Sequence, residues 1–325
     1  VHSGQHYDDG LSEQFFREFT LKTPKYNLEI GSASHNIFIA RFLMGFDAIL
    51  DQENPDMVVV VGDTNTTAAA AIASAKRNIP LSHVEAGLRE WDKTVPEEVN
   101  KLITDSISDL YFTPTKTGVE NLIAEGVSKH VYMTGDITLD LLVDDQYILD
   151  EKSLKARYKL SGDYVFMTCH RAVNTDNFEN LNGIVNAVNS VDLPVVWSLH
   201  PRTKAALKRE SLINTLGDHI KLIPPISYKD SQSLIKYASR VLTDSGGVIK
   251  EAYFHKTRGI IIDTQTEWIE TVEEGWNIVA GPNTKDIIAA YENNAEPQDH
   301  SNALGDGQAG FRIIREIYKY LENRK

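Results

Sequence analysis

Two acidic side chains follow two short apolar segments of the chain, at positions where strands of a parallel sheet would end. The run from Met57 to Val61 stops at Gly62-Asp63, an alanine-rich helical segment follows, and a second short strand, Leu81 to Val84, ends on Glu85. Ligands bind beyond the carboxyl ends of the strands in an open parallel sheet, so both acids should face the ligand. We predict that Asp63 and Glu85 perform acid–base chemistry.

A third carboxylate, Glu97, lies at the predicted start of a helix. Pro96 suits the first helical position, and the acids at 97 and 98 complement the helix dipole. Each of the three acids, taken alone, could equally be a solvated or capping residue at the end of an element. Together with phosphate-binding groups elsewhere in the chain, they suit a reaction that removes a proton and expels a phosphate.

The segment Thr243-Asp244-Ser245-Gly246-Gly247 has the composition of a phosphate-binding turn between a strand and a helix. The glycines let the backbone approach a ligand closely, and the free amides at a helix start favour an anion. Glu251 lies one turn further along and is placed to reach sugar hydroxyls. A plain turn with a helix cap is the alternative interpretation.

Two histidines follow predicted strands in the second half of the chain. His170-Arg171 comes after the strand at 164–168, and His200-Pro201-Arg202 after the strand at 194–199. A histidine there can neutralise phosphate or transfer a proton, because imidazole titrates near neutral pH. A histidine satisfied by the backbone is the alternative. Cys169 would point to the opposite face of the strand from His170, so we interpret it as a packing residue.

Composition excludes several classes of protein. The formal net charge of -13 argues against nucleic-acid binding, and no apolar run approaches the length of a membrane span. The single cysteine, Cys169, excludes an internal disulfide and fits a reducing compartment, so we expect a cytoplasmic protein. No GxGxxG or GxSxG motif occurs, and no metal-ligand set is grouped in the sequence, so we expect neither a dinucleotide cofactor nor a metal.

The chain of 325 residues is long enough for two domains, and its alternation of strands and helices restarts halfway. We predict an α/β fold with two Rossmann-like domains, parallel sheets and a central cleft. The first domain would cover residues 1–150, with the C-terminal helix at 309–325 packing back on it, and the second residues 160–308. After a helix from Leu139 to Leu149, the polar stretch Asp150 to Gly162 would join them. Val1-His2 looks like the end of a strand, so we expect a preceding strand, loop and helix to be missing from this sequence.

Eight motifs of the chain are similar, in type and order, to those of the non-hydrolysing UDP-N-acetylglucosamine 2-epimerases. They are GQHYD (4–8), GDTNTT (62–67), HVEAGLR (83–89), PEEVN (96–100), TGD (134–136), HRAVNTDN (170–177), TDSGGVIKE (243–251) and TEWIE (266–270). The resemblance implies a glycosyltransferase-B fold whose C-terminal domain holds most of the nucleotide. It also implies that UDP is eliminated across C1 and C2 of the sugar to give a glycal and is then added back, with no nicotinamide cofactor and no metal.

The resemblance also assigns roles to individual residues. Asp63, Glu85, Glu97 and His170 would be catalytic, Ser245 and Gly246 would bind the diphosphate, and Glu251 would hold the ribose. Further expected contacts with the UDP-sugar are Gln5, His6, Arg89, Arg171, His200 and Gly247. A homodimer is expected from the family and from the apolar helix at 37–50.

The chain departs from the family pattern at several positions. The family's Gly-Thr-Arg-Pro-Glu loop is absent from this sequence, Lys101 replaces an arginine, and Ile262 replaces another. Lysine keeps the charge of arginine but not its planar fork. We expect interconversion of UDP-GlcNAc and UDP-ManNAc. The alternatives are epimerisation of a UDP-2,3-diacetamido-uronate, a hydrolysing reaction that releases ManNAc, and a silent UDP-sugar-binding protein.

Overall fold

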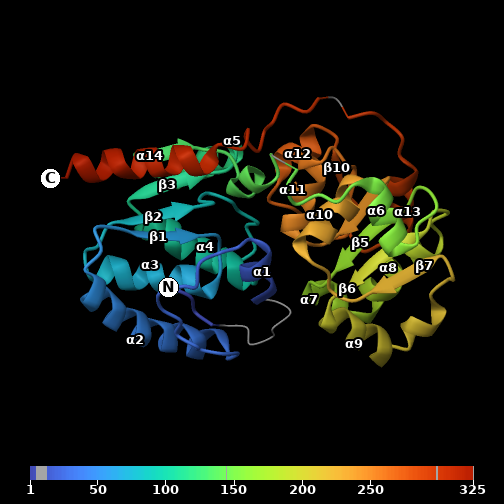
Figure 1. Cartoon of the computed structure of the whole chain (residues 1–325), viewed down its shortest axis with the longest axis horizontal. Helices are drawn as coiled ribbons and strands as arrows, with labels where there is room; N and C mark the ends of the chain where they lie inside the picture. Colours follow the sequence, from blue (N-terminus) through green and yellow to red (C-terminus); the bar gives the residue numbers. More distant parts are fainter. Residues whose placement is uncertain (5–12, 144, 298, 325) are drawn as a thin grey trace. The chain divides into compact units, whose positions relative to one another are not determined.

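The computed structural model describes residues 1–4, 13–143, 145–297 and 299–324, which fall into two units, each with its own parallel sheet (Figure 1). The first unit consists of Val1–Val143 together with Ala303–Lys325, and the second unit of Asp144–Asn302. The chain therefore leaves the first unit once and returns to it for its last helix.

The first unit is built on a four-stranded parallel sheet in the order β1-β2-β3-β4. The strands are Val58–Val61 (β1), Leu81–Val84 (β2), Leu110–Thr113 (β3) and Val131–Met133 (β4). The strand predicted from Leu81 to Val84 is confirmed to the residue, and the strand that leads to Asp63 begins one residue later than predicted.

The helices of the first unit are Glu13–Glu18 (α1), His35–Glu53 (α2), Asn65–Lys76 (α3), Pro96–Ile107 (α4), Lys116–Ala124 (α5), the 3-10 helix Ile137–Leu141 (η1) and Ala309–Glu322 (α14). Helices pack on both faces of the sheet. Three phenylalanines of α2, at 38, 42 and 46, pack in one cluster with the alanines of α3 and the inward valines of β1 (Figure 1). The small alanine side chains allow α3 to lie close to the strands.

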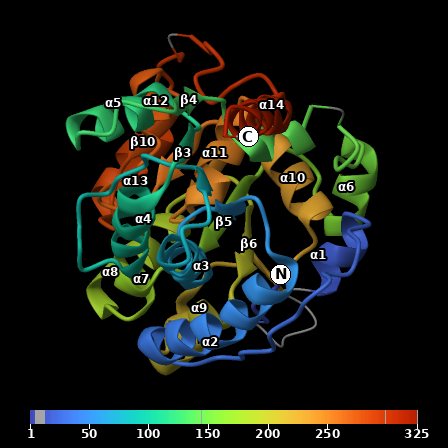
Figure 2. The same ribbon diagram turned by 90° about the vertical axis from the view of Figure 1, so that its left-hand side faces the viewer.

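The C-terminal helix α14, seen almost end-on in Figure 2, covers the other face of the sheet, where Ile313 packs with Leu110 and Phe112. The carboxylate of Asp140 accepts the first amides of α14, from Ala309 at 3.0 Å and Gly310 at 2.7 Å. The helix predicted from Leu139 to Leu149 is wrong. Among the described residues of this range only η1 forms a helix, because its Asp140 caps α14 and the chain then leaves the unit after Val143.

The second unit contains a six-stranded parallel sheet in the order β10-β9-β8-β5-β6-β7. The strands are Val165–Cys169 (β5), Val195–Leu199 (β6), Ile220–Ile223 (β7), Arg240–Thr243 (β8), Gly259–Ile261 (β9) and Asn277–Val279 (β10). The helices are Glu151–Tyr158 (α6), Ala172–Thr175 (α7), Phe178–Asn189 (α8), Pro201–Arg209 (α9), the 3-10 helix Leu212–Thr215 (η2), Tyr228–Lys236 (α10), Gly246–Phe254 (α11), Ile269–Glu273 (α12) and Thr284–Glu292 (α13).

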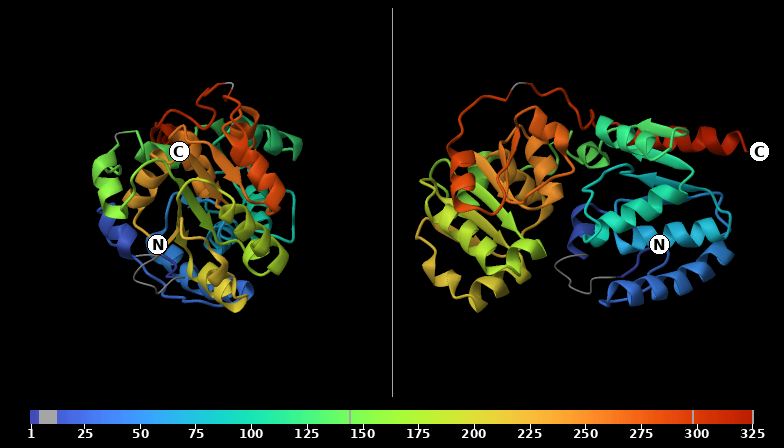
Figure 3. Two further views of the ribbon diagram at one scale, coloured as in Figure 1. Left: turned by 90° about the vertical axis from the view of Figure 1, so that its right-hand side faces the viewer. Right: turned by 180° about the vertical axis from the view of Figure 1, so that it is seen from behind.

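Both faces of the second sheet are buried, as expected for parallel strands (Figure 3). One face packs against α8, α9 and α13, and the other against α6, α10 and α11. Cys169 is buried in the first of these clusters, which confirms its interpretation as a packing residue. The polar stretch Asp150 to Gly162 does not connect the two units, because it forms α6 and buries Leu154 in the second core.

The order of the strands gives the second sheet a topological switch point between β5 and β8. From β5 the chain adds β6 and β7 on one side, and it then returns to place β8, β9 and β10 on the other. The helices that follow β5 and β8 pack on opposite faces, so a crevice opens between them at the carboxyl ends of the strands. Ligand-binding groups are expected at this point of the sheet.

None of the helices in the described ranges combines the length and apolar character that a bilayer crossing needs.

Candidate active site

The sheet of the first unit places Asp63 and Glu85 next to each other along its carboxyl edge. Val61 pairs with Val84, so the chain leaves two adjacent strands at the same level, through Gly62 on β1 and Glu85 on β2. Both residues adopt the left-handed conformation, with φ of 69° at Gly62 and 68° at Glu85. This conformation is costly for a residue with a side chain, and such strain concentrates at functional sites.

Two side chains of α4 hold the Asp63 turn. Asn100 Nδ2 donates to the Asp63 carbonyl oxygen at 2.9 Å, and the Lys101 ammonium lies 3.6 Å from Asp63 Oδ2. The Lys101 side chain is only 4% exposed, whereas that of Asp63 is 33% exposed. The Asp63 carboxylate is thus accessible, and its charge partner, Lys101, is buried. In the sequence, Lys101 is recognisable only as a replacement for an arginine of the family.

The two acids at the start of α4 differ in role. Glu97 is exposed, as an acid acting on a ligand has to be, and lies where the helix dipole stabilises a negative charge. Glu98 is 1% exposed, and its carboxylate accepts the backbone amides of Glu90 at 2.9 Å and Trp91 at 3.2 Å. Glu98 therefore fixes the loop before α4, and Glu97 is the candidate for chemistry.

Arg89 does not have the position expected of a ligand contact. Its guanidinium is fully buried and bonds the carboxylates of Asp105 at 2.7 Å and Glu125 at 2.7 and 2.8 Å. The third nitrogen donates to the Leu88 carbonyl oxygen at 2.7 Å. Because all these partners belong to the first unit, we assign Arg89 to the support of the turn after β2 and not to substrate binding.

In the second unit, one buried carboxylate joins the ends of β5 and β8 at the switch point. Asp244, which has no exposed surface, accepts the backbone amides of His170 at 2.9 and 3.0 Å and of Arg171 at 2.9 Å. It also accepts the side-chain amide of Asn174 at 3.0 Å. Asp244 therefore holds the His170 segment beside the Ser245 turn, a role that could not be predicted from its place in the TDSGG motif.

The rings of His170 and His200 lie together at the carboxyl edge of the second sheet, with centroids 5.6 Å apart. The His170 side chain is 41% exposed. His200 caps α9, its Nδ1 accepting the Arg202 amide at 3.2 Å. Partial burial lowers the pKa of His200, and the charges of His170 and Arg202 lower it further. The pair forms an accessible surface that could bind an anion.

The start of α11 has the features of an anion site. Ser245 caps the helix, and neither Gly246 nor Gly247 has a positive φ. A Cβ atom would meet its nearest neighbour at 3.4 Å on Gly246 and at 3.8 Å on Gly247, so packing within the chain does not require glycine at either position. The neighbour at 3.4 Å from a Cβ atom on Gly246 is the indole Nε1 of Trp268. This side chain is 2% exposed, and its Nε1 has no hydrogen-bond partner among the described residues.

Other predicted groups are placed around this turn. Glu251 lies on α11 and is 9% exposed. The Arg171 guanidinium is 32% exposed and bonds the Asp263 carboxylate at 2.8 Å. Thr266, at the start of the TEWIE motif, lies before α12, and its hydroxyl accepts the Trp268 amide at 3.2 Å.

Gln5 and His6 lie outside the described residues. Within the described part of the chain, no three His, Cys, Asp or Glu side chains are grouped as a metal site.

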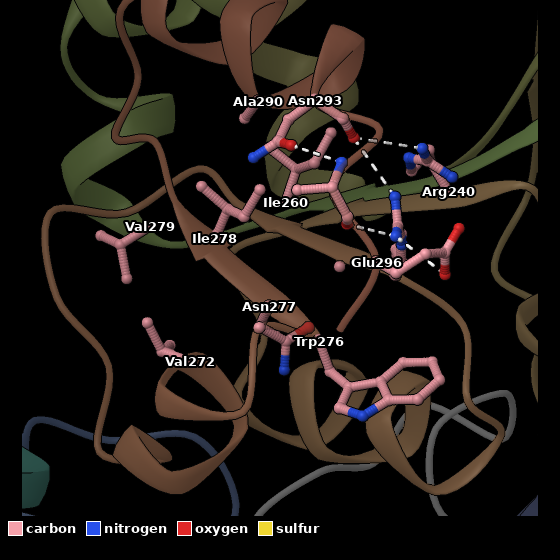
Figure 4. A pocket seen from close by; sticks show the side chains of 14 residues that line it. Arg240, Ile260, Val272, Trp276, Asn277, Ile278, Val279, Ala290, Asn293 and Glu296 are labelled. Atoms are coloured by element: carbon pink, nitrogen blue, oxygen red, sulfur yellow. Dashed lines mark hydrogen bonds and ion pairs between the residues drawn. The ribbon is translucent and has the colours of Figure 1, made fainter. Parts of the chain in front are cut away.

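A cavity of about 430 Å³ opens at the opposite edge of the second sheet (Figure 4). Arg240 and Arg258, at the amino ends of β8 and β9, line it together with Trp276 of the segment before β10. Both arginines donate to the Asn293 carbonyl oxygen, at 3.4 and 3.3 Å, and so cap the end of α13. None of the residues that line this cavity is a candidate site residue at the carboxyl edge of the sheet.

The two parallel-sheet units define a protein of the glycosyltransferase-B type of fold. The model of the UDP-N-acetylglucosamine 2-epimerase family matches residues 1–318, and the chain belongs to this family.

Three similar proteins illustrate its range. A UDP-N-acetylglucosamine 2-epimerase homolog of Methanococcus maripaludis is 40% identical, over 98% of this chain and 90% of the relative. A UDP-2,3-diacetamido-2,3-dideoxy-D-glucuronate 2-epimerase of Pseudomonas aeruginosa is 35% identical, over 98% of this chain and 90% of that relative. The crystal structure of the Methanocaldococcus jannaschii UDP-GlcNAc 2-epimerase in complex with UDP-GlcNAc and UDP has a TM-score of 0.90 at 38% identity, over 98% of this chain and 91% of that one.

Proposed function

We propose that the chain interconverts UDP-GlcNAc and UDP-ManNAc by the non-hydrolysing route. The observation that carries the proposal is a division of chemistry within one chain. Asp63 and Glu85 follow two adjacent strands of the first unit, and Glu97 lies at the start of α4 in the same unit, whereas a helix start that suits an anion lies at the switch point of the second. The family and its complex with UDP-GlcNAc and UDP support the same assignment.

In this proposal the second unit holds the nucleotide. The first amides of α11, together with Ser245 and Gly246, bind the diphosphate, which is the kind of ligand that a helix N-terminus stabilises. Gly247 leaves room for the same group, and Trp268 Nε1 supplies one more donor. His170, His200 and Arg171 offset the negative charge that grows on the diphosphate as it departs, and Glu251 accepts hydrogen bonds from the ribose.

The first unit acts on the sugar. A carboxylate removes the proton from C2 as the bond between C1 and the UDP oxygen breaks, which gives UDP and an unsaturated acetamido sugar. A second carboxylate returns a proton to C2 on the other face, and the UDP oxygen adds back to C1. Atoms balance without a redox step, and general acid–base catalysis of this kind contributes about 10²–10⁴-fold each time. The Lys101 ammonium is a charge partner for the carboxylate form of Asp63.

A UDP-linked diacetamido-uronate is the second candidate substrate, because the Pseudomonas aeruginosa relative is named for it. A uronate substrate would carry an additional carboxylate and require an additional cation to bind it. Purified protein is therefore incubated separately with UDP-GlcNAc and with the diacetamido-uronate nucleotide, and the products are identified by NMR. We expect UDP-ManNAc from the first and no turnover of the second. Free ManNAc with UDP would show a hydrolysing enzyme, and turnover of the uronate alone would replace the proposed substrate.

A further inference from the structure

The cavity at the amino edge of the second sheet has the size and lining of a small-molecule site (Figure 4). Its volume is about 430 Å³, and sites for small molecules have volumes of about 300–1,000 Å³ with mostly apolar walls and a few polar groups. The apolar lining comes from two strands and two helices: Ile260 of β9, Ile278 and Val279 of β10, Val272 of α12 and Ala290 of α13. The cavity thus offers an apolar surface to a ligand of small-molecule size.

Two arginines lie side by side at one end of this cavity. Arg240 begins β8, Arg258 immediately precedes β9, and the register of these parallel strands places the two residues next to each other. Burial and, next, the charge of Arg258 lower the pKa of Arg240, although Tyr291 and Glu296 oppose the shift. In Figure 4 Arg240 lies to one side of the cavity and Val279 to the other. The cavity therefore has a cationic end and an apolar end.

The positive charge of the arginine pair is only partly balanced. The carboxylate of Glu296 lies 3.3 Å from Arg258, but its side chain is 90% exposed, and solvent screens such a charge. Among the described residues no carboxylate lies at this distance from Arg240, whose guanidinium donates to neutral oxygens, Ser239 O at 2.8 Å and Asn294 Oδ1 at 3.2 Å. An anion that reached the pair would therefore meet positive charge without a close partner.

Capping of α13 does not account for both arginines. Their shared partner is the carbonyl oxygen of Asn293, at 3.4 and 3.3 Å, which is longer than the usual N–H···O distance of about 2.7–3.2 Å. A helix end carries only about half a unit of negative charge. The Nε atoms of Arg240 and Arg258 have no hydrogen-bond partner in the described part of the chain. Each guanidinium thus keeps a donor for a carboxylate.

Trp276 adds an aromatic ring of fixed position to the lining. Its indole Nε1 donates to the Asp299 carbonyl oxygen at 2.6 Å. The ring stands nearly perpendicular to those of Tyr253 and His300, with interplanar angles of 89° and 84°. An aromatic surface that is already held in place can bind a flat apolar group without the cost of ordering it first.

We propose that this cavity is a second ligand site, for a small organic anion whose carboxylate binds Arg240 and Arg258 and whose flat apolar body lies against β9, β10 and Trp276. A nucleotide sugar does not fit this site, because its hydroxyl groups would face apolar walls without partners. Ligands of the catalytic kind bind beyond the carboxyl ends of parallel strands, whereas this cavity lies at their amino ends. The inference therefore goes beyond the proposed function and does not rest on it.

Calorimetry of the full chain tests the site with three probes. Sodium 2-naphthoate carries a carboxylate on a flat apolar body, 2-naphthalenemethanol has the same body without the charge, and inorganic phosphate has charge without the body. We expect naphthoate to bind one site with a Kd on the order of 0.1–1 mM, and the other two probes to bind at least about tenfold more weakly. No binding of naphthoate, or equal binding of either other probe, would overturn the inference.

Variants locate the bound probe. Arg240→Gln and Arg258→Gln each remove one charge, and we expect each to raise the Kd for naphthoate at least about tenfold. Arg157→Gln, at a side chain that is 55% exposed and pairs with Asp230, is the control and should leave this Kd unchanged. Arg171→Gln removes a cation at the carboxyl edge instead. Loss of naphthoate binding in that variant and not in Arg240→Gln would place the probe at the nucleotide site and overturn the inference.

A crystal structure of the wild-type protein decides the question if the arginine variants do not fold. Crystals grown with 6-bromo-2-naphthoate contain a bromine atom that anomalous scattering locates. We expect it beside Val272 and Val279, away from Arg240 (Figure 4). Bromine at another position, or none, would contradict the site. Wild-type protein without epimerase activity would remove the proposed function and leave this result standing.

Discussion

The buried carboxylate of Asp244 accepts the backbone amide of His170 through both of its oxygens, at 2.9 and 3.0 Å. The two residues follow β5 and β8, the strands on either side of the switch point, so this contact joins the histidine segment to the turn at Ser245. The geometry of the proposed nucleotide site thus depends on one acid that is itself inaccessible to ligand.

Asp244→Asn should therefore weaken UDP binding without removing any ligand contact. The asparagine presents an N–H group to donors that need acceptors, and a buried mismatch of this kind costs about 1–3 kcal/mol. We expect the Kd for UDP, measured by calorimetry, to rise at least about tenfold, with a parallel fall in the free energy of unfolding. Asp163→Asn, at an exposed position, is the control. An unchanged Kd would show that Asp244 does not organise the site.

Replacing the carboxylates of the first unit should affect chemistry and not nucleotide binding. Asp63→Asn, Glu85→Gln and Glu97→Gln each remove a proton acceptor, and we expect losses in kcat of about 10²–10⁴-fold. The Kd for UDP should stay within about twofold, because UDP is held by the second unit in the proposal. Glu120→Gln, at a side chain that is 59% exposed on α5, is the matched control. Normal turnover in any of the three variants would remove that acid from the mechanism.

Gly247→Ala should stabilise the protein and weaken its ligand binding. Its φ is not positive, and a Cβ atom would meet nothing nearer than 3.8 Å, so alanine should raise the free energy of unfolding by about 0.4–1 kcal/mol. The same methyl group would stand where the diphosphate approaches the backbone, and UDP affinity should fall. Gly162→Ala, also in open space, should have no effect on UDP affinity. Tight UDP binding by Gly247→Ala would place the diphosphate elsewhere.

The stability of the second unit should decline on acidification because of His255. Burial and, to a smaller extent, the charge of Lys236 lower the pKa of His255 to about 4, although the charge of Asp145 opposes the shift. The unfolded chain binds this proton near pH 6.5 and the folded chain only near pH 4, so stability is lost as the pH falls through that window. The loss should approach about 3 kcal/mol. In urea titrations from pH 7 to 4, His255→Gln should reduce this slope, and an equal slope would assign the effect to other groups.

Strands and helix starts could be predicted from the sequence because apolar runs and capping residues determine them locally. β2 and the start of α4 at Pro96 were placed to the residue. The edge strand β10 and the helix α13 were missed, since three residues give no periodic signal and α13 buries only two of its side chains. The early end of the helical segment at Leu141 was not predicted, because Asp140 of η1 binds the first amides of α14, which lies far away in the sequence.

The candidate site residues at the strand ends could be predicted from the sequence, whereas the buried charged residues that hold them in place could not. On α4, the buried residues Glu98, Lys101 and Asp105 are charged, whereas Val99 is 37% exposed, so apolar spacing misleads about which face is inside. Charged residues at spacings of three and four on one helix face were the signal that could have revealed this network. Arg89 illustrates the same point, because its motif does not show that Asp105 on α4 and Glu125 at the end of α5 bind its guanidinium.

The central claim is that carboxylates of the first unit exchange the proton at C2 of a UDP-linked acetamido sugar. It is tested most directly by incubating the protein with UDP-GlcNAc in deuterated water and measuring C2 by NMR and mass spectrometry. We predict one deuterium at C2 in both UDP-GlcNAc and UDP-ManNAc, lost together with activity in Asp63→Asn. Formation of UDP-ManNAc with no deuterium at C2, or no exchange with any UDP-acetamido sugar, would contradict the account.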